Sequence, residues 1–267
     1  MKPTVSMVLL LGSIVCFNAA CKKGGDDNTV TPPPVTQVDS GQIYFHLHTY
    51  VGDNEVDLYN ITYTLDNGRQ ISLSEAQMYI SGIQLVKPNG TTYNLSNVTL
   101  LKTLENESYY VAKVPVDTYK SVKFYVGLDA TTNQKTPSGS SSDILNHPEM
   151  WFSSTAQPGG YIFMNVSGKI DTTAGANGTT AQMQPFTYHI GTDAHYTQVS
   201  MPDHSPYYVV TKDQIEYIHM IIDYSGLFNG LQLNNSSNLS VLTKTDNSTP
   251  LGNTITANIP GMFRYEE

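Results

Sequence analysis

Two histidines separated by one residue are the sharpest chemical feature of the sequence. His46 and His48 flank Leu47 in a segment where apolar and polar residues alternate. In a β-strand, side chains two positions apart point to the same side with Cα atoms roughly 6.5–7 Å apart, so two such imidazoles can reach one ion. The pair therefore indicates a candidate metal site, although two solvated or hydrogen-bonded strand histidines would have the same spacing.

The chain has 7 histidines in all, and the others are weaker candidates. His189 lies between Tyr188 and Ile190, so we expect its side chain on the polar face of its strand. His147 precedes Pro148, which disfavours helix and indicates a loop from which the imidazole could reach a site or cap a turn. Solvated or core positions are more frequent than metal sites for the remaining three, which are His195, His204 and His219.

Sequence signatures of enzymes are missing. The chain contains no HExxH, no GxSxG and no glycine-rich phosphate loop, so we expect no enzymatic activity. The oxygen-rich stretch 53–57 could hold calcium, but its spacing does not match an EF-hand loop, and a solvated turn is the better interpretation. Glu55 also follows His48 too late for the cupin pattern that begins with two alternating histidines.

Composition excludes one class of partner and favours one fold class. The 267 residues include 23 Asp and Glu against 14 Lys and Arg, a formal net charge of −9, so we expect no nucleic-acid binding. Only 14% of residues are charged, while Tyr occurs 18 times. Tyrosine with abundant Asn, Thr, Ser and Gly suits half-solvated strands and turns better than helices. An all-β protein is the expectation.

The elements that must position the histidines are short strands separated by turns. Ile43, Phe45 and Leu47 share one face of the first strand and should point to the core. Turn sequences at 66–68 and 88–90 predict hairpins. Helix is expected only for about one turn at 74–77 and another near 144–145, and residues 131–142 and 171–182 are expected to be polar surface loops. The pattern predicts an antiparallel β-sandwich with an immunoglobulin-like arrangement and long polar loops.

The N-terminal segment has the features of an export signal. Lys2 and the apolar run at 8–15 form a stretch too short to span a membrane, and Asn18, Ala19 and Ala20 before Cys21 resemble a lipoprotein cleavage site. We therefore expect a signal peptide at 1–20, a lipidated Cys21 with a disordered tether at 21–40, and a single β-sandwich domain at 41–267. Cleavage after Ala20 without lipidation is the alternative. Asp26 and Asp27 resemble the acidic signal that sends lipoproteins to the outer face of the outer membrane, although a solvated linker has the same composition. We expect an outer-membrane lipoprotein, on the periplasmic or the cell-surface face.

Six sequence blocks, in order, resemble the MbnP-like copper-binding protein family. Each block alone is unspecific, but together they span 43–263, nearly the whole predicted domain. The blocks are Phe45–His48 with Gly52, Tyr79–Leu85, Tyr119 with Val122–Asp129, Met150–Trp151 with Gly160–Phe163, Phe186–Gly191, and Asp223 with Leu227–Phe228 and Asn258–Phe263.

The resemblance implies an exported β-sandwich that binds one copper ion through histidines, at positions that are His48 and His189 here. It leaves the third ligand open between His46 and His147. Some members carry a tryptophan at the position of His46, oxidised to kynurenine by a partner di-haem cytochrome c peroxidase-like protein. Here His46 could replace it as a ligand, and Trp151, in a different block, is a remote candidate for oxidation. The predicted mature domain lacks a cysteine ligand for electron transfer, so capture or storage of Cu(I) or Cu(II) is expected.

A carbohydrate-binding or adhesion module without metal is the alternative. The 18 tyrosines, the single Trp151 and the polar loops could present aromatic faces to sugars. Copper binding requires the histidines to converge, whereas sugar binding requires a row of exposed aromatic rings.

Overall fold

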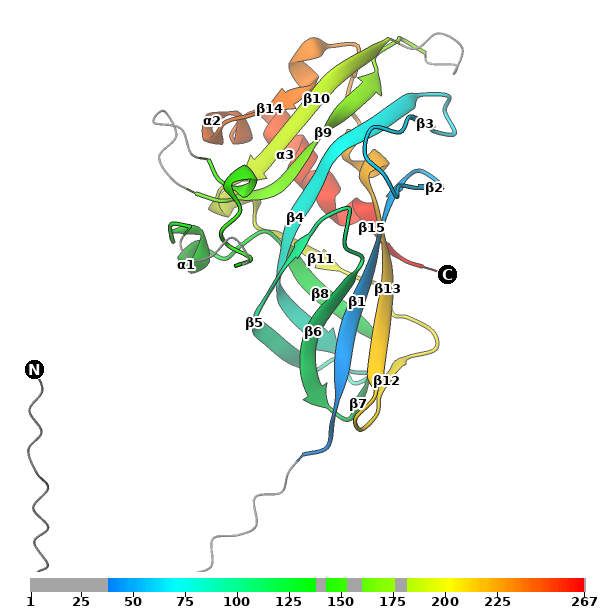
Figure 1. Ribbon diagram of the computed structural model, residues 1–267, viewed down its shortest axis with the longest axis vertical. Helices are drawn as coiled ribbons and strands as arrows, with labels where there is room; N and C mark the ends of the chain where they lie inside the picture. Colours follow the sequence, from blue (N-terminus) through cyan, green and yellow to red (C-terminus); the bar gives the residue numbers. More distant parts are fainter. Residues whose placement is uncertain (1–37, 138–142, 153–159, 176–181, 267) are drawn as a thin grey trace, which may run out of the picture. The chain divides into compact units, whose positions relative to one another are not determined.

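The strands form two large sheets that face each other across the core (Figure 1). The computed structural model describes residues 38–137, 143–152, 160–175 and 182–266. Val38–Glu267 form one compact unit. Cys21 and the predicted signal peptide lie outside the described residues, as does nearly all of the predicted tether. No helix within the described ranges is both long and apolar enough to cross a membrane.

The smaller of the two sheets carries the histidine pair. Its five strands are β1 (Ser40–Val51), β2 (Asn54–Glu55), β6 (Ser108–Pro115), β13 (Ile215–Asp223) and β15 (Phe263–Tyr265). In this sheet β13 pairs with β1 and β15 pairs with β13, while β2 and β6 also pair with β1.

The larger sheet lies on the other side of the core. Its eight strands are β3 (Tyr63–Thr64), β4 (Gln70–Val86), β5 (Thr92–Lys102), β8 (Ser121–Val126), β9 (Ile162–Asp171), β10 (Met183–Gly191), β11 (Thr197–Ser200) and β14 (Ser240–Val241). The long strand β4 lies at the centre of this sheet and pairs with four other strands, β3, β5, β8 and β9. A separate pair consists of β7 (Asp117–Tyr119) and β12 (Tyr208–Val210).

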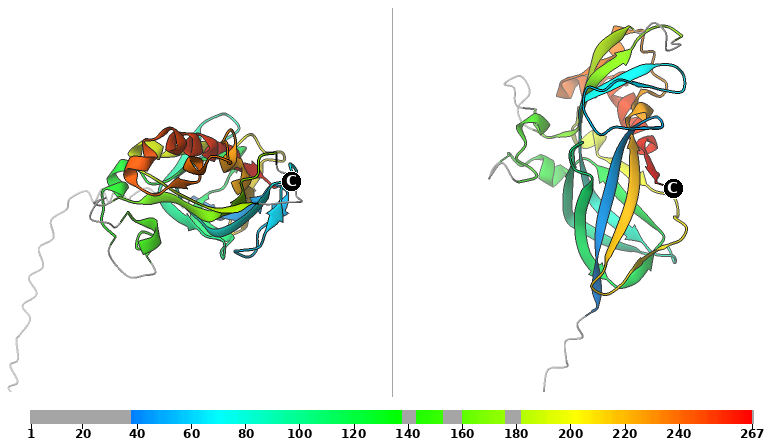
Figure 2. Two further views of the ribbon diagram at one scale, coloured as in Figure 1. Left: turned by 90° about the horizontal axis from the view of Figure 1, so that it is seen from above. Right: turned by 45° about the vertical axis from the view of Figure 1, so that its right-hand side comes forward.

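The described helices are short, and several follow one another near the C-terminus (Figure 2). They are α1 (Ala130–Asn133), α2 (Lys244–Asn247), α3 (Pro250–Asn258) and the 3-10 turns η1 (Pro148–Met150), η2 (Asp193–His195), η3 (Tyr224–Phe228), η4 (Ser236–Asn238) and η5 (Ile259–Met262).

Buried and partly exposed side chains alternate strictly along β1. Ile43, Phe45 and Leu47 are completely buried, whereas His46 and His48 lie on the opposite, partly exposed face. This is the predicted division of the strand, and the all-β sandwich-like fold is confirmed. The sheets are mixed, however, because β1 pairs with β13 in parallel. Parallel neighbours need a long crossover connection, and here nearly all of the larger sheet lies between β1 and β13 in the chain.

The structure differs from the expected helices in two places. Residues 74–77 belong to β4 and not to a helix; a register shift between Leu73 and Glu75 marks a β-bulge, which breaks the alternation that a regular strand shows. Near the C-terminus, α3 was not predicted. Its start follows known rules, because the Thr249 side chain accepts a hydrogen bond from Gly252 N and Pro250 occupies the first turn.

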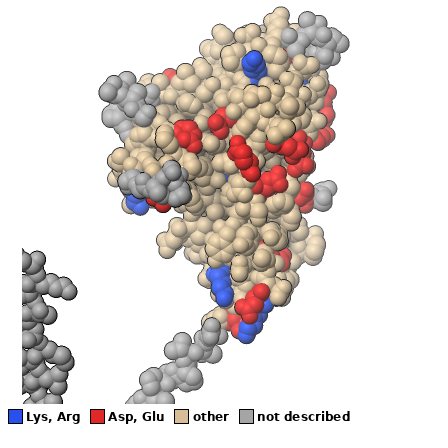
Figure 3. Space-filling model, in the orientation of Figure 1, with Lys and Arg blue, Asp and Glu red and all other residues tan. Residues whose placement is uncertain are grey.

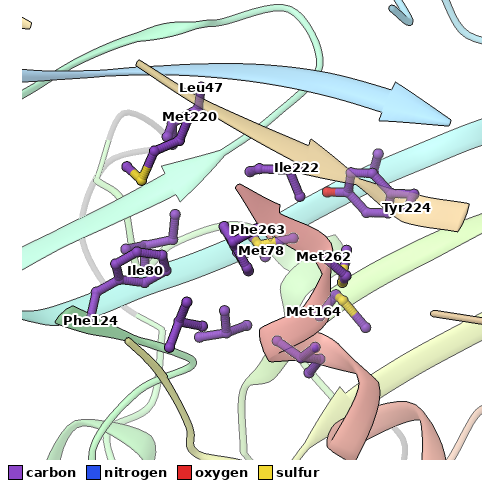
Figure 4. Close-up of a cluster of buried hydrophobic side chains, with 14 of the residues drawn as sticks. Leu47, Met78, Ile80, Phe124, Met164, Met220, Ile222, Tyr224, Met262 and Phe263 are labelled. Carbon is purple, nitrogen blue, oxygen red and sulfur yellow. The ribbon is translucent and has the colours of Figure 1, made fainter. Parts of the chain in front are cut away.

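Aromatic and sulfur-containing side chains fill the space between the sheets (Figure 4). Phe124 of β8 is fully buried, with its ring centroid 5.0 Å from that of Phe263 and 6.3 Å from that of Phe45. Since Phe45 and Phe263 belong to the smaller sheet, Phe124 links the two layers. This contact fixes the sheet whose outer face carries the histidines.

Candidate metal centre

Three imidazoles converge on the outer face of the smaller sheet. His46 and His48 come from β1 and His219 comes from β13; one ligand atom from each lies within 4.8 Å of the others. The parallel register places His46 directly opposite His219. In Figure 1 the two strands run side by side. Strand alternation and one long-range pairing thus suffice to build the cluster.

His219 was not predicted as a ligand. In β13 the completely buried side chains are Ile218, Met220 and Ile222, which leaves His219 on the outer face, the same face as His46 and His48. The alternation of these three apolar residues in the sequence already indicated that His219 lies on the face opposite the core. It could not indicate that β13 pairs with β1.

Three carboxylates surround the imidazoles, and each comes from a different segment. Glu55 lies in β2, which follows β1 through a two-residue turn in which Gly52 has a φ of 64°. Glu107 precedes β6, and its carbonyl accepts a hydrogen bond from Leu47 N at 2.8 Å. Glu266 follows β15, and its N–H donates to the His219 carbonyl at 3.3 Å. Backbone pairing therefore positions all three.

The side chains form a connected polar network. The His48 Nδ1 lies 2.6 Å from Glu55 Oε1, and the His219 Nδ1 lies 3.1 Å from both His46 Nδ1 and Glu266 Oε2. Glu107 Oε2 is 3.6 Å from His46 Nε2, an ion-pair distance rather than a hydrogen bond. A single proton on the His219 Nδ1 can form a hydrogen bond with only one of these two atoms. The network therefore has more acceptors than donors when the imidazoles are neutral.

The donor set fits a bound transition-metal ion. The His48 Nε2 is buried without a hydrogen bond and has Glu266 Oε2 at an ion-pair distance of 3.3 Å. Two nitrogens at about 2.0–2.1 Å from one ion lie roughly 2.9–3.4 Å apart, and the His46 and His219 Nδ1 atoms are 3.1 Å apart. His46, His48 and His219 are thus the residues that would hold an ion here.

Electrostatics keeps at least one imidazole available as a ligand. Burial, followed by the neighbouring His48 and His219, lowers the pKa of His46 below its usual range, and Glu107 and Glu266 oppose that shift only in part. His46 is therefore neutral at pH 7, with a nitrogen lone pair to offer. On the face shown in Figure 3, acidic side chains gather at mid-height, and the visible Lys and Arg lie away from them. This charge distribution attracts cations.

The centre is open to solvent on one side. His219 and Glu266 line a surface hollow of about 370 Å³ together with Tyr217. The His219 side chain is 45% exposed, so an ion could enter and leave without any rearrangement of the sheet.

A buried lysine supports the segment that carries Glu107. Lys102 is 0% exposed, and its Nζ donates to the carbonyls of Thr103 at 2.5 Å and Asn106 at 3.2 Å. Burial lowers its pKa to about 8, and Glu107 and Glu105 oppose that shift. Lys102 thus holds the turn between β5 and β6 in place.

Lys102 is expected to make stability rise with pH. Its pKa is about 8 when folded and about 10.4 when unfolded, so between these values the unfolded chain binds more protons and the free energy of unfolding increases. Relative to a Lys102→Met variant, the wild type should gain on the order of 2 kcal/mol between pH 7 and pH 9.5. Urea denaturation of both proteins at several pH values measures this, and parallel curves would contradict it.

The other predicted site residues lie elsewhere. His189 belongs to β10 of the larger sheet, where burial lowers its pKa despite a hydrogen bond with the backbone of Leu242. His147 precedes η1, with its Nδ1 3.1 Å from Glu149 Oε1. Neither belongs to the histidine cluster found among the described residues. Their roles as ligands stay predictions.

Trp151 packs in a second, smaller hydrophobic cluster. Its ring meets that of Tyr161 edge to face at 4.8 Å, and the two residues form an isolated β-bridge. The expected core or interface position agrees with this packing. Its oxidation stays a prediction.

Tyrosines adjoin the cluster on the outer face. The ring of Tyr44 lies 5.4 Å from that of Tyr110 and 5.5 Å from that of Tyr217, at interplanar angles of 63° and 43°. The Tyr44 ring is thus tilted against both neighbours and does not form a flat platform with either of them for a sugar chain.

Comparisons with known proteins point to one family. A sequence model described as MbnP matches residues 40–245. Among solved structures, MbnP from Methylosinus trichosporium is similar, with 13% sequence identity, a TM-score of 0.47, and coverage of 82% of this chain and 88% of that one. No curated protein matches. The family match includes β1 and β13, which carry all three clustered histidines.

Proposed function

The chain belongs to the MbnP family, and from this premise we propose that it binds a single copper ion through His46, His48 and His219 for copper capture or storage. The observation that carries the proposal is the convergence of three imidazoles, with one ligand atom of each within 4.8 Å of the others. Copper supplies a Lewis acid that imidazole nitrogens coordinate well. The chain's own contribution is to hold the three rings and the surrounding carboxylates in register.

Copper content of a double variant tests the proposal. Purified protein, loaded with copper and desalted, is expected to retain about one ion per chain, and His46→Ala/His48→Ala protein should retain almost none because two of three imidazoles are gone. Elemental analysis against protein concentration measures the ratio, with thermal unfolding as a control for folding. Equal copper in both proteins would refute the assignment.

Acid is expected to release the copper. Protons compete with the ion for imidazole nitrogens, but the lowered pKa of His46 leaves more than half of this ligand neutral at pH 6.5, where an ordinary histidine is half protonated. Retention should therefore be constant above about pH 7 and fall as the pH drops through about 6. Equilibrium dialysis between pH 8 and pH 4.5 measures the profile. Loss of copper already between pH 8 and pH 7 would contradict it.

The cellular setting is part of the proposal. We propose a non-enzymatic envelope lipoprotein, exported by residues 1–20 and anchored to the outer membrane through lipid on Cys21, on its periplasmic or cell-surface face. The support is the sequence around Cys21. A di-haem cytochrome c peroxidase-like partner is proposed from the family resemblance alone. Mass spectrometry of the mature N-terminus tests the lipid, and an unmodified Cys21 would remove the anchor.

A further inference from the structure

A second hollow lies outside the metal centre. Its volume is about 750 Å³, and its rim is formed by the β1–β2 turn, the β3–β4 hairpin and the segment around η3. In Figure 1, β2 and β3 lie close together at this part of the molecule. None of the three clustered histidines lines the hollow, so the copper site does not account for it.

The chain has only two arginines, and both line this hollow. Arg69 follows the turn at 66–68, and its guanidinium donates to the Asp171 carbonyl. Arg264 belongs to β15, with its guanidinium carbon 5.5 Å from the centre of the Tyr50 ring. Within the described ranges neither guanidinium makes another hydrogen bond or an ion pair. Because a guanidinium has five N–H donors, most of them are left for a ligand.

Carboxylates line the same hollow without contacting the arginines. They belong to Asp53, Asp66 and Asp223. The Asp223 Oδ1 accepts hydrogen bonds from Gly52 N and Ser225 N, each at 2.9 Å. The exposed Asp53 and Asp66 side chains accept none from the part of the chain that the structure describes. Opposite charges thus share one hollow but do not pair, and a ligand with both charges can bridge them.

The lining between these charges is apolar. Leu65 and Leu231 are partly buried and pack against the core, and Ile170, Phe228 and Leu233, which also line the hollow, are buried. Ligand sites in proteins combine such an apolar lining with a few polar groups that fix the orientation of the ligand. A matching ligand has a negative group, a positive group and an apolar body.

We propose that this hollow binds short apolar peptides with free termini. The peptide carboxylate binds to Arg69 and Arg264, because the guanidinium fork matches the geometry of a carboxylate. The terminal ammonium binds to Asp53 and Asp66, and the apolar side chains pack on the lining at Leu65. The hollow is larger than a single amino acid, which favours a peptide of a few residues. The inference does not depend on copper, because no histidine of the metal centre takes part.

Four small peptides test the proposal on the metal-free protein at pH 7. Isothermal titration calorimetry with leucyl-leucine is expected to give a dissociation constant below about 1 mM. Acetylation of its N-terminus removes the positive charge and amidation of its C-terminus removes the negative charge, so each should weaken binding about 10- to 100-fold. Diglycine keeps both charges but lacks apolar side chains and should bind at least about tenfold more weakly. Equal affinity for all four compounds, or no binding below about 10 mM, would overturn the proposal.

Two variants assign the charged groups. Arg264→Met should bind leucyl-leucine about 10- to 100-fold more weakly, and should distinguish it from its amide by a smaller factor than the wild type does. Asp53→Asn/Asp66→Asn should likewise distinguish it from its acetylated form by a smaller factor. Unchanged affinity, or equal losses for the free and the blocked peptides, would overturn these assignments. Lys212→Met is the matched control, because it breaks an exposed ion pair with Asp39 that does not line the hollow, and it should bind like the wild type. Circular dichroism checks the folding of each variant.

NMR locates the peptide. On addition of leucyl-leucine to the metal-free protein, backbone amide shifts are expected to change at Asp53, Asn67 and Asn229, which line the hollow. The amides of His46 and His219 should stay unchanged. Changes concentrated at these two histidines would place the peptide at the metal centre and overturn the proposal.

Discussion

In the His219→Ala variant, the affinity for copper is expected to fall by at least about 100-fold, because loss of a ligand should exceed the 10- to 100-fold effect of losing an outer-shell partner. His219 lies opposite His46 in the parallel register, with 3.1 Å between their Nδ1 atoms. Removing it leaves two imidazoles and opens the cluster further to water. Its partly exposed position means that the fold should tolerate alanine. Chelator competition at pH 7.5 measures the change.

The His189→Ala variant tests the alternative position of the site. His189 lies in the larger sheet and outside the cluster, so its removal should change the affinity by less than about threefold, as expected for a distant site. A large loss in His189→Ala with none in His219→Ala would move the site to the His48 and His189 pair that the family resemblance implies.

Phe124→Ala is expected to lower the free energy of unfolding by about 3–5 kcal/mol, the usual cost of emptying a buried phenylalanine site. Phe124 is 0% exposed and contacts Phe263 and Phe45 of the opposite sheet, so neither layer can close the cavity alone. Urea denaturation measures the loss. The matched control is Val209→Ala, at a residue that is 52% exposed, where a change within about 0.5 kcal/mol is expected. A loss below about 1 kcal/mol for Phe124→Ala would show that the sheets are not joined through this ring.

Local sequence patterns predicted the parts of the fold that depend on neighbouring residues. The alternation of Ile43, Phe45 and Leu47 gave the buried face of β1 and put His46 and His48 on the other. The turn at 66–68 joins β3 to β4, and the turn at 88–90 joins β4 to β5, as their sequences indicated. Such signals need only residues that are close in the chain.

The residues of the centre that were missed depend on pairing between distant segments. His219 is 173 positions from His46, and no local pattern states that β13 lies parallel to β1. Glu55 was interpreted as part of a solvated turn because neither the cupin nor the EF-hand spacing fits. Its relation to His48 follows from the β1–β2 hairpin. Glu107 and Glu266 reach the centre through loops and strand ends, for which residue spacing carries little information.

The parallel pairing of β1 with β13 also determines when the centre can exist during biosynthesis. A chain emerges N-terminus first, so His46 and His48 appear early, while His219 appears only after nearly all of the larger sheet has been made. Non-local pairings form late in folding because the intervening chain must be ordered first. Until β13 docks, a nascent chain can offer an ion only two imidazoles and exchanges it freely. Tightly held copper would then mark a chain whose synthesis and folding are both complete, and immature chains would not withdraw the metal.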